Sequence, residues 1–134
     1  MKKTNVSAMF AKDKNLESNG KWFEVGDGIE FLIRRVEGAN APRMKSIRAK
    51  YVKPKLRQIQ SGTMTVEAET AIYVRVFVEG CLVDWKGITD EENNIVEYSD
   101  SVAIDLLNST PDLFDLLSGF ANEGESFKEE LGKS

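Results

Sequence analysis

Hydrophobic and polar positions first alternate between residues 21 and 36. Residues 21–25 and 29–36 are rich in aromatic and β-branched residues, and Gly26-Asp27-Gly28 separates the two runs. This pattern predicts a β-hairpin, because glycine allows the backbone conformations of a tight turn. Since an isolated two-stranded ribbon is marginally stable in water, we expect its apolar face, which includes Phe31, to pack against helices.

The next segment changes to helical spacing. Asn40 is a plausible N-cap and Pro42 fits the first turn of a helix that covers residues 43–60. Its apolar stripe is thin, and basic residues fill the other faces. Pro54 should bend or end this helix near Lys53, so we expect two helical pieces.

Two further amphipathic helices are predicted near the end of the chain. Ser99 precedes the first, which carries Leu106 on its apolar side. Thr110-Pro111 precedes the second, whose apolar side includes Leu117. Between residues 90 and 94 we expect an exposed acidic turn, followed by a short extended piece at 95–98.

The central stretch, residues 65–87, is ambiguous. Its β-branched residues alternate between 72 and 78 as in a strand. Thr65, with acids in the first turn, would equally begin a helix. On that reading one helical face carries Ala71, Val74, Val78, Cys81, Leu82 and Trp85. Periodicity alone leaves both readings open for residues 70–83.

The stretch ends in Trp85-Lys86-Gly87, where a large aromatic residue precedes one that is free to take positive φ. We interpret Trp85 as a buried anchor and Gly87 as the end of its element. Trp22, in the first predicted strand, would either be packed in the core, which its large area favours, or lie half exposed at an interaction edge.

The length of 134 residues suits one domain with one core. We predict an α+β fold, in which the N-terminal β-hairpin packs against a mostly helical domain of about four to five helices. Residues 1–20 are expected to be loosely ordered, residues 21–121 to form the domain, and residues 122–134 to be an acidic, frayed tail with Phe127 as its one anchor.

Charge is distributed unevenly, although the net charge is -4. Residues 34–57 hold nine basic residues and one acid, whereas residues 84–134 hold thirteen acids and three lysines. Such blocks attract each other within a Debye length, about 10 Å at 0.1 M salt, and otherwise offer surfaces to partners. The charged residues that we expect to face a partner are Arg43, Lys45, Arg48, Asp90, Glu91 and Glu92.

The composition excludes several kinds of chemistry. The chain has no histidine, the commonest general base and metal ligand, and its single cysteine, Cys81, cannot form an intrachain disulfide. No phosphate loop, nucleophile elbow, zinc spacing or membrane-spanning run occurs. We therefore expect no catalytic residue, cofactor or metal, no membrane association, and a cytoplasmic protein. Nucleic-acid binding by the basic run is a weaker reading, because little aromatic interleaving accompanies it.

The order of these features, roughly over residues 21–127, resembles the tail assembly chaperones of long-tailed bacteriophages and their prophage relatives. The matching pieces are the strand pair before Arg34-Arg35, the basic helix after Asn40, residues 83–90 around Trp85-Lys86-Gly87, and the approach to the two leucine-bearing helices. This chain has Glu92-Asn93-Asn94 where the family often has a glycine, so the turn is expected to differ in shape.

The resemblance implies a binding protein of the bacterial cytoplasm. It implies partners: the tape measure protein, which the chaperone keeps soluble, and the tail tube protein, which polymerises around that client. It also favours a helix for the central stretch, and a longer frameshifted product made near Gly132-Lys133. Because the client is long, we expect self-association, with head-to-tail contacts between oppositely charged blocks. The alternatives are a structural tail component retained in the virion, such as a tube or completion protein, and a nucleic-acid-binding regulator.

Overall fold

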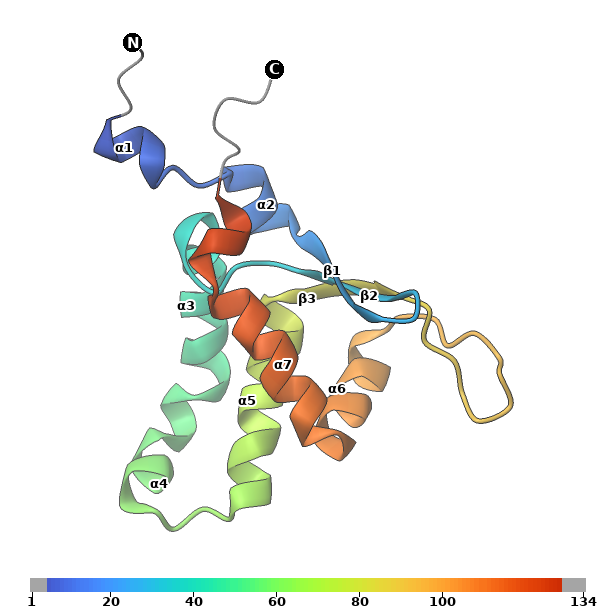
Figure 1. The fold of residues 1–134 in the computed structure, drawn as a ribbon. Helices are drawn as coiled ribbons and strands as arrows, with labels where there is room; N and C mark the ends of the chain where they lie inside the picture. Colours follow the sequence, from blue (N-terminus) through green and yellow to red (C-terminus); the bar gives the residue numbers. More distant parts are fainter. Residues whose placement is uncertain (1–4, 129–134) are drawn as a thin grey trace.

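A small antiparallel sheet lies across one end of a group of helices (Figure 1). The computed structural model describes residues 5–128. Strands β1 (Lys21–Gly26) and β2 (Ile29–Ile33) form the predicted hairpin, and β3 (Leu82–Lys86) pairs with the other side of β2. The α+β prediction is confirmed, and the third strand is an addition to it.

Cross-strand register explains which face of the sheet is buried. Phe23 lies opposite Phe31, and Phe31 opposite Trp85, so three aromatic residues form one row. Because side chains alternate along a strand, the neighbouring row of Trp22, Leu32 and Asp84 points to the other face. The first row faces the helices, and Phe31 is fully buried.

An arm of antiparallel helices extends away from the sheet (Figure 1). It consists of α3 (Ala41–Tyr51), the 3₁₀ helix η2 (Lys53–Lys55), α4 (Leu56–Ser61) and α5 (Val66–Gly80). Pro54 lies inside η2, so the predicted break near Lys53 is confirmed. Gly62, with φ of +71°, ends α4 in the left-handed conformation that glycine adopts without strain.

The central stretch is both helix and strand. Thr65 caps α5, since its hydroxyl accepts a hydrogen bond from the Ala68 amide at 3.1 Å. The predicted helical face that continued through Leu82 and Trp85 is wrong, because α5 ends at Gly80 and both residues lie in β3. Only pairing with β2, which is distant in sequence, distinguishes a strand here.

Helices α6 (Asp100–Ser109) and α7 (Pro111–Asn122) cover the remaining side of α5 and the sheet (Figure 1). Ser99 caps α6 through the Val102 amide, as predicted. The arm, α6 and α7 supply five α-helices, in line with the predicted four to five, and two short ones, α1 (Val6–Met9) and α2 (Lys14–Asn19), precede the sheet.

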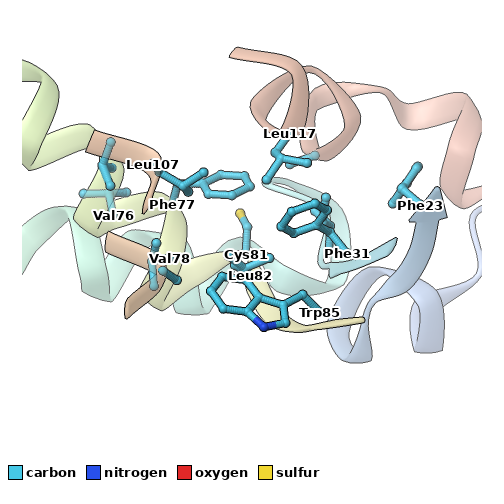
Figure 2. Close-up of a cluster of buried hydrophobic side chains, with 14 of the residues drawn as sticks. Phe23, Phe31, Val76, Phe77, Val78, Cys81, Leu82, Trp85, Leu107 and Leu117 are labelled. Atoms are coloured by element: carbon cyan, nitrogen blue, oxygen red, sulfur yellow. The ribbon is translucent and has the colours of Figure 1, made fainter. Parts of the chain in front are cut away.

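One hydrophobic core joins sheet and helices (Figure 2). Ring contacts link Phe31 to Trp85, Phe77 to Phe114, and Phe23 to Phe120. The fully buried residues Leu107 and Leu117 bring α6 and α7 into the same cluster. Burial of apolar area at about 25 cal/mol per Å² is the main force that holds these elements together.

The two ends of the described chain meet beside the hairpin. The 3₁₀ helix η3 (Gly124–Phe127) buries Phe127 against Phe23, and the Asp13 amide donates to the Phe127 carbonyl at 2.8 Å. The domain boundaries at residues 20 and 121 stay a prediction. The loosely ordered start and the frayed tail lie partly outside the described residues, and the frameshift position at Gly132-Lys133 lies wholly outside them.

Candidate functional site

The predicted anchors occupy different depths. Trp85 is 6% exposed, contacts Tyr98 edge-on at 5.0 Å between ring centroids, and donates from Nε1 to the Val96 carbonyl at 2.8 Å. Leu117 is buried and Leu106 is half-buried. Trp22 lies outside the buried cluster, on the open face of the sheet, where the ammonium group of Lys86 lies 4.0 Å from its ring centroid.

Gly87 ends β3 with φ of +79°. A Cβ atom at this position would collide with the carbonyl oxygen of Gly28 in the hairpin turn. Glycine is therefore required twice at Gly87, by its backbone conformation and by the close approach of another backbone segment.

The predicted partner-facing charges lie in two separate regions. Arg43, Lys45 and Arg48 are exposed on α3, whereas the acidic turn at 90–94 projects from the end of the sheet (Figure 1). Within residues 5–128, no ion pair joins residues 34–57 to residues 84–128. The two charged blocks are therefore both available to partners outside the chain.

Asp90 shapes the acidic turn. Its Oδ1 accepts hydrogen bonds from the Glu92 and Asn94 amides, each at 2.9 Å, and these bonds lower the pKa of Asp90. Asn93 takes a positive φ of 64° in place of the glycine expected from the resemblance. Glu91 and Glu92 remain exposed at its tip.

A groove with basic edges runs along the outer side of α3, η2 and α4. We call it the basic groove; its volume is about 290 Å³, and it is lined by Lys45, Arg48, Ala49, Val52, Lys53 and Leu56. The floor is apolar, and Leu56 is 42% exposed. Its lining residues recur at helical spacing between residues 45 and 56, but local spacing does not show whether a helix face is left uncovered.

A second hollow, the arm cleft, lies between the arm and α6. Its volume is about 440 Å³, and it is lined by Lys50, Tyr51, Pro54, Lys55, Ala71, Ile72, Arg75, Ile104 and Asn108. Three helices that are distant in sequence meet there. This cleft combines apolar walls with three cationic side chains.

The Tyr51 ring lies close to two of the three cations of the arm cleft. The Lys50 ammonium and the Arg75 guanidinium lie 5.1 Å and 5.2 Å from its centroid, within the range of cation–π attraction. A side-chain hydrogen bond to Tyr51 raises the pKa of Lys50, so this ammonium stays charged at neutral pH. The cleft can therefore receive an apolar segment that carries acidic groups.

The position predicted for Asn40, at the N-cap of α3, is confirmed, whereas a capping hydrogen bond from its side chain is not. Asn40 immediately precedes α3, but its buried side chain makes no capping hydrogen bond. Its amide nitrogen instead donates to the Arg35 carbonyl at 2.8 Å and the Gly80 carbonyl at 3.0 Å, and its oxygen accepts from Arg43 at 2.6 Å. Asn40 thus ties the start of α3 to the end of α5.

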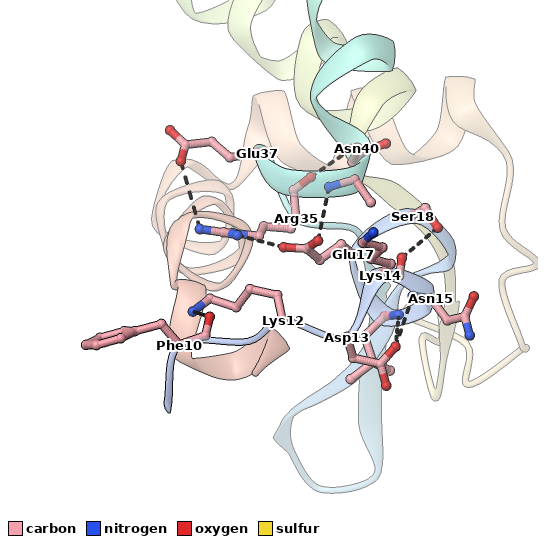
Figure 3. A network of polar contacts seen from close by, with 12 residues as sticks. Phe10, Lys12, Asp13, Lys14, Asn15, Glu17, Ser18, Arg35, Glu37 and Asn40 are labelled. Carbon is pink, nitrogen blue, oxygen red and sulfur yellow. Dashed lines mark hydrogen bonds and ion pairs between the residues drawn. The ribbon is translucent and has the colours of Figure 1, made fainter. Parts of the chain in front are cut away.

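A buried carboxylate in α2 extends this polar network (Figure 3). Glu17 accepts from Arg35 at 2.6 Å and from the Ala39 amide at 3.0 Å, and its residue is only 2% exposed. Arg43 also belongs to this network, since its guanidinium donates a hydrogen bond to the side-chain oxygen of Asn40. Arg43 is therefore partly structural, while Lys45 and Arg48 remain free to face a partner.

Cys81 is fully buried between the end of α5 and β3, as expected for a small core residue. Burial raises the pKa of its thiol to about 12. A thiol that is protonated at neutral pH and closed off from solvent is a poor nucleophile.

The described residues offer neither a metal site nor a membrane span. Among residues 5–128, no group of three or more acidic or cysteine side chains is arranged to hold a metal ion. In the same part of the chain, no helix has both the length and the apolar character needed to cross a bilayer. The surface features described above that could bind a partner are the basic groove, the arm cleft and the two charged regions.

Comparison with known proteins gave one family match. A family model described as YdaY prophage protein matches residues 39–133, which include the arm, β3, the acidic turn, α6 and α7. No curated protein and no solved structure matches the chain. Because the matched region covers more than half of its length, the chain belongs to the YdaY prophage protein family.

Proposed function

We propose that this prophage protein is a tail assembly chaperone. It acts in the host cytoplasm, where it binds the tape measure protein, keeps it soluble, and promotes polymerisation of tail tube subunits around it. The observation that carries the proposal is the ordered resemblance that ends in Trp85-Lys86-Gly87. Membership of a prophage family supports the setting, because a prophage can encode tail proteins.

The arm cleft suits such a client. A long helical protein exposes apolar stripes before assembly. A groove with apolar walls can cover such a stripe along successive turns of the client helix. Tyr51 and Ile72 supply apolar contact, and Arg75 can pair with acidic groups beside a client stripe. Binding through such surfaces requires no bond to be made or broken, so we propose that the protein is not an enzyme.

Co-expression tests the proposal. The tape measure protein of the same prophage is expressed alone and with this chain, and its soluble fraction is measured. We expect the soluble fraction to rise at least about tenfold, the change expected from about 1.4 kcal/mol of net stabilisation. An unchanged soluble fraction contradicts the chaperone function.

A matched pair of variants tests the cleft. Ala71→Glu places an acidic side chain in the arm cleft, whereas Ala68→Glu makes the same change on α5 outside the residues that line it. Both positions are exposed, so neither change should unfold the protein. We expect Ala71→Glu to abolish solubilisation and Ala68→Glu to preserve it.

The two alternative functions predict different observations. A structural tail component would be found by mass spectrometry in purified particles, whereas a chaperone would be absent. A nucleic-acid-binding regulator would show salt-sensitive DNA retention that is lost when Arg43, Lys45 and Arg48 are neutralised. The basic arm, with seven basic residues and no acid over residues 41–57, is what favours this second alternative.

A further inference from the structure

The basic groove has a counterpart on the same molecule. Helix α7 exposes Leu116, whose exposed fraction is 46%, next to the exposed acids Asp112 and Asp115. A shallow hollow beside it is bordered by Gly119 and Glu123. We call this surface the acidic face of α7; residues 111–127 contain four acids and no basic residue.

We propose that the basic groove of one copy of this chain binds the acidic face of α7 of a second copy. The apolar floor around Leu56 would receive Leu116, and Lys45, Arg48 and Lys53 would lie around its flanking acids. The opposite charges therefore strengthen the apolar contact, and they also fix the orientation of one copy relative to the other.

Both surfaces run along helical segments. Helix α7 has twelve residues, and so a length of about 18 Å at 1.5 Å per residue. The basic groove is formed by successive elements, from Lys45 in α3 to Leu56 at the start of α4, and so offers an elongated seat. Within residues 5–128, Leu56 and Leu116 are 42% and 46% exposed.

The contact has a predictable symmetry. Because the groove and the acidic face of α7 consist of different residues, one contact leaves a free groove at one end and a free acidic face at the other. Association therefore continues to a ring or a filament. Each surface offers one exposed leucine beside a small hollow, so we expect a contact of the weak class, which buries less than about 1,200 Å².

This inference goes beyond the proposed function and does not require it, since it concerns copies of this chain alone. Sedimentation velocity of the purified full chain over a range of concentrations tests it. We expect species larger than a dimer as concentration rises. We also expect dissociation when salt is raised from about 0.1 M to about 1 M, which shortens the Debye length from about 10 Å to about 3 Å.

Two variants test the two surfaces of the contact one at a time. Leu56→Asp damages the basic groove and Leu116→Asp damages the acidic face of α7, each at an exposed position. We expect each variant alone to self-associate at least about tenfold more weakly. Mixed together, they should form a dimer and nothing larger, because one intact groove then meets one intact acidic face.

Val66→Asp is the matched control. It puts the same charge at another exposed apolar position, 76% exposed and outside both surfaces, and should leave association unchanged. Circular dichroism checks that all three variants remain folded. A wild-type chain that is monomeric throughout, a mixture that forms no dimer, or equal loss in Val66→Asp would each overturn the proposal. The co-expression result is independent of these outcomes.

Discussion

Asn40 connects three segments through one buried side chain. Its bonds reach Arg35 in the segment after β2, the start of α3 and the end of α5. Because the side chain is only 1% exposed, water cannot replace these bonds if they are lost. The arm is thus fixed to the sheet by a polar contact as well as by apolar packing.

Asn40→Ala should lower the free energy of unfolding by about 2–4 kcal/mol, because two buried carbonyl groups lose a donor. Urea denaturation measures the change. Asn15→Ala, at an exposed position of α2, is the control and should change stability by less than about 0.5 kcal/mol. Similar losses in both variants would show that the network carries little stability.

Two glycines should respond to alanine in opposite directions. Gly87→Ala is expected to cost about 1–3 kcal/mol, since its positive φ and the nearby Gly28 carbonyl both oppose a Cβ atom. Gly119→Ala, within α7 and with open space around its Cβ, should stabilise the chain by about 0.5–1 kcal/mol. Thermal unfolding compares them. A loss in Gly119→Ala as large as that in Gly87→Ala would contradict this reasoning.

Cys81 makes stability depend on alkaline pH. The folded state raises its pKa to about 12, so in the unfolded chain the thiol ionises first, near pH 8.5. Stability from this group is present below about pH 8.5 and is lost as pH rises towards 12. Between about pH 7 and pH 10 the wild type should lose about 2 kcal/mol more than Cys81→Ala. Parallel pH profiles of the two proteins would refute this prediction.

At the scale of elements, β3 depends on Trp85. Trp85→Ala should cost about 3–5 kcal/mol, because a buried indole and its hydrogen bond to Val96 are both lost. Trp22→Ala removes an indole from the open face of the sheet and should cost about 1 kcal/mol. Denaturant titrations of both variants provide the comparison. Equal costs would mean that depth in the core does not explain the role of Trp85.

Capping residues and proline predicted where most helices begin or end. The remaining boundaries depend on contacts between residues that are distant in sequence. Thr65, Ser99 and Pro54 each act within a few residues, and their effects appear where the sequence indicates them. The end of α5 at Gly80 is different, because it depends on contacts that are distant in sequence. Strand β3 pairs with β2 from Leu82 onward, and Gly80 lies close to the Met44 sulfur on α3. Local periodicity does not predict which residues of different helices will be in contact.

The same distinction applies to the candidate site. Charge counts identified the basic block and Arg43, Lys45 and Arg48 within it, but not that Arg43 is held by Asn40. Both hollows form from elements that are separated by a bend or by distance along the chain. Local periodicity places apolar residues on helix faces, but it does not show which of those faces remain uncovered in the fold.

At the scale of the whole molecule, the two charged blocks lie on different parts of the surface. The arm carries the basic block, and the acidic block continues from the turn at 90–94 through α7. Since the described residues form no ion pair between these blocks, we infer that charges in both blocks are available for contacts between molecules. One surface can then serve copies of the chain while the arm cleft remains free for a client.

Direct titration of the purified chain with a soluble helical fragment of the tape measure protein tests the central claim. Calorimetry at several temperatures should show saturable binding with a negative heat-capacity change, the mark of apolar burial. Binding should be lost in Ala71→Glu and kept in Ala68→Glu. If the wild-type chain shows no binding, or both variants bind equally well, the proposed role of the arm cleft is contradicted.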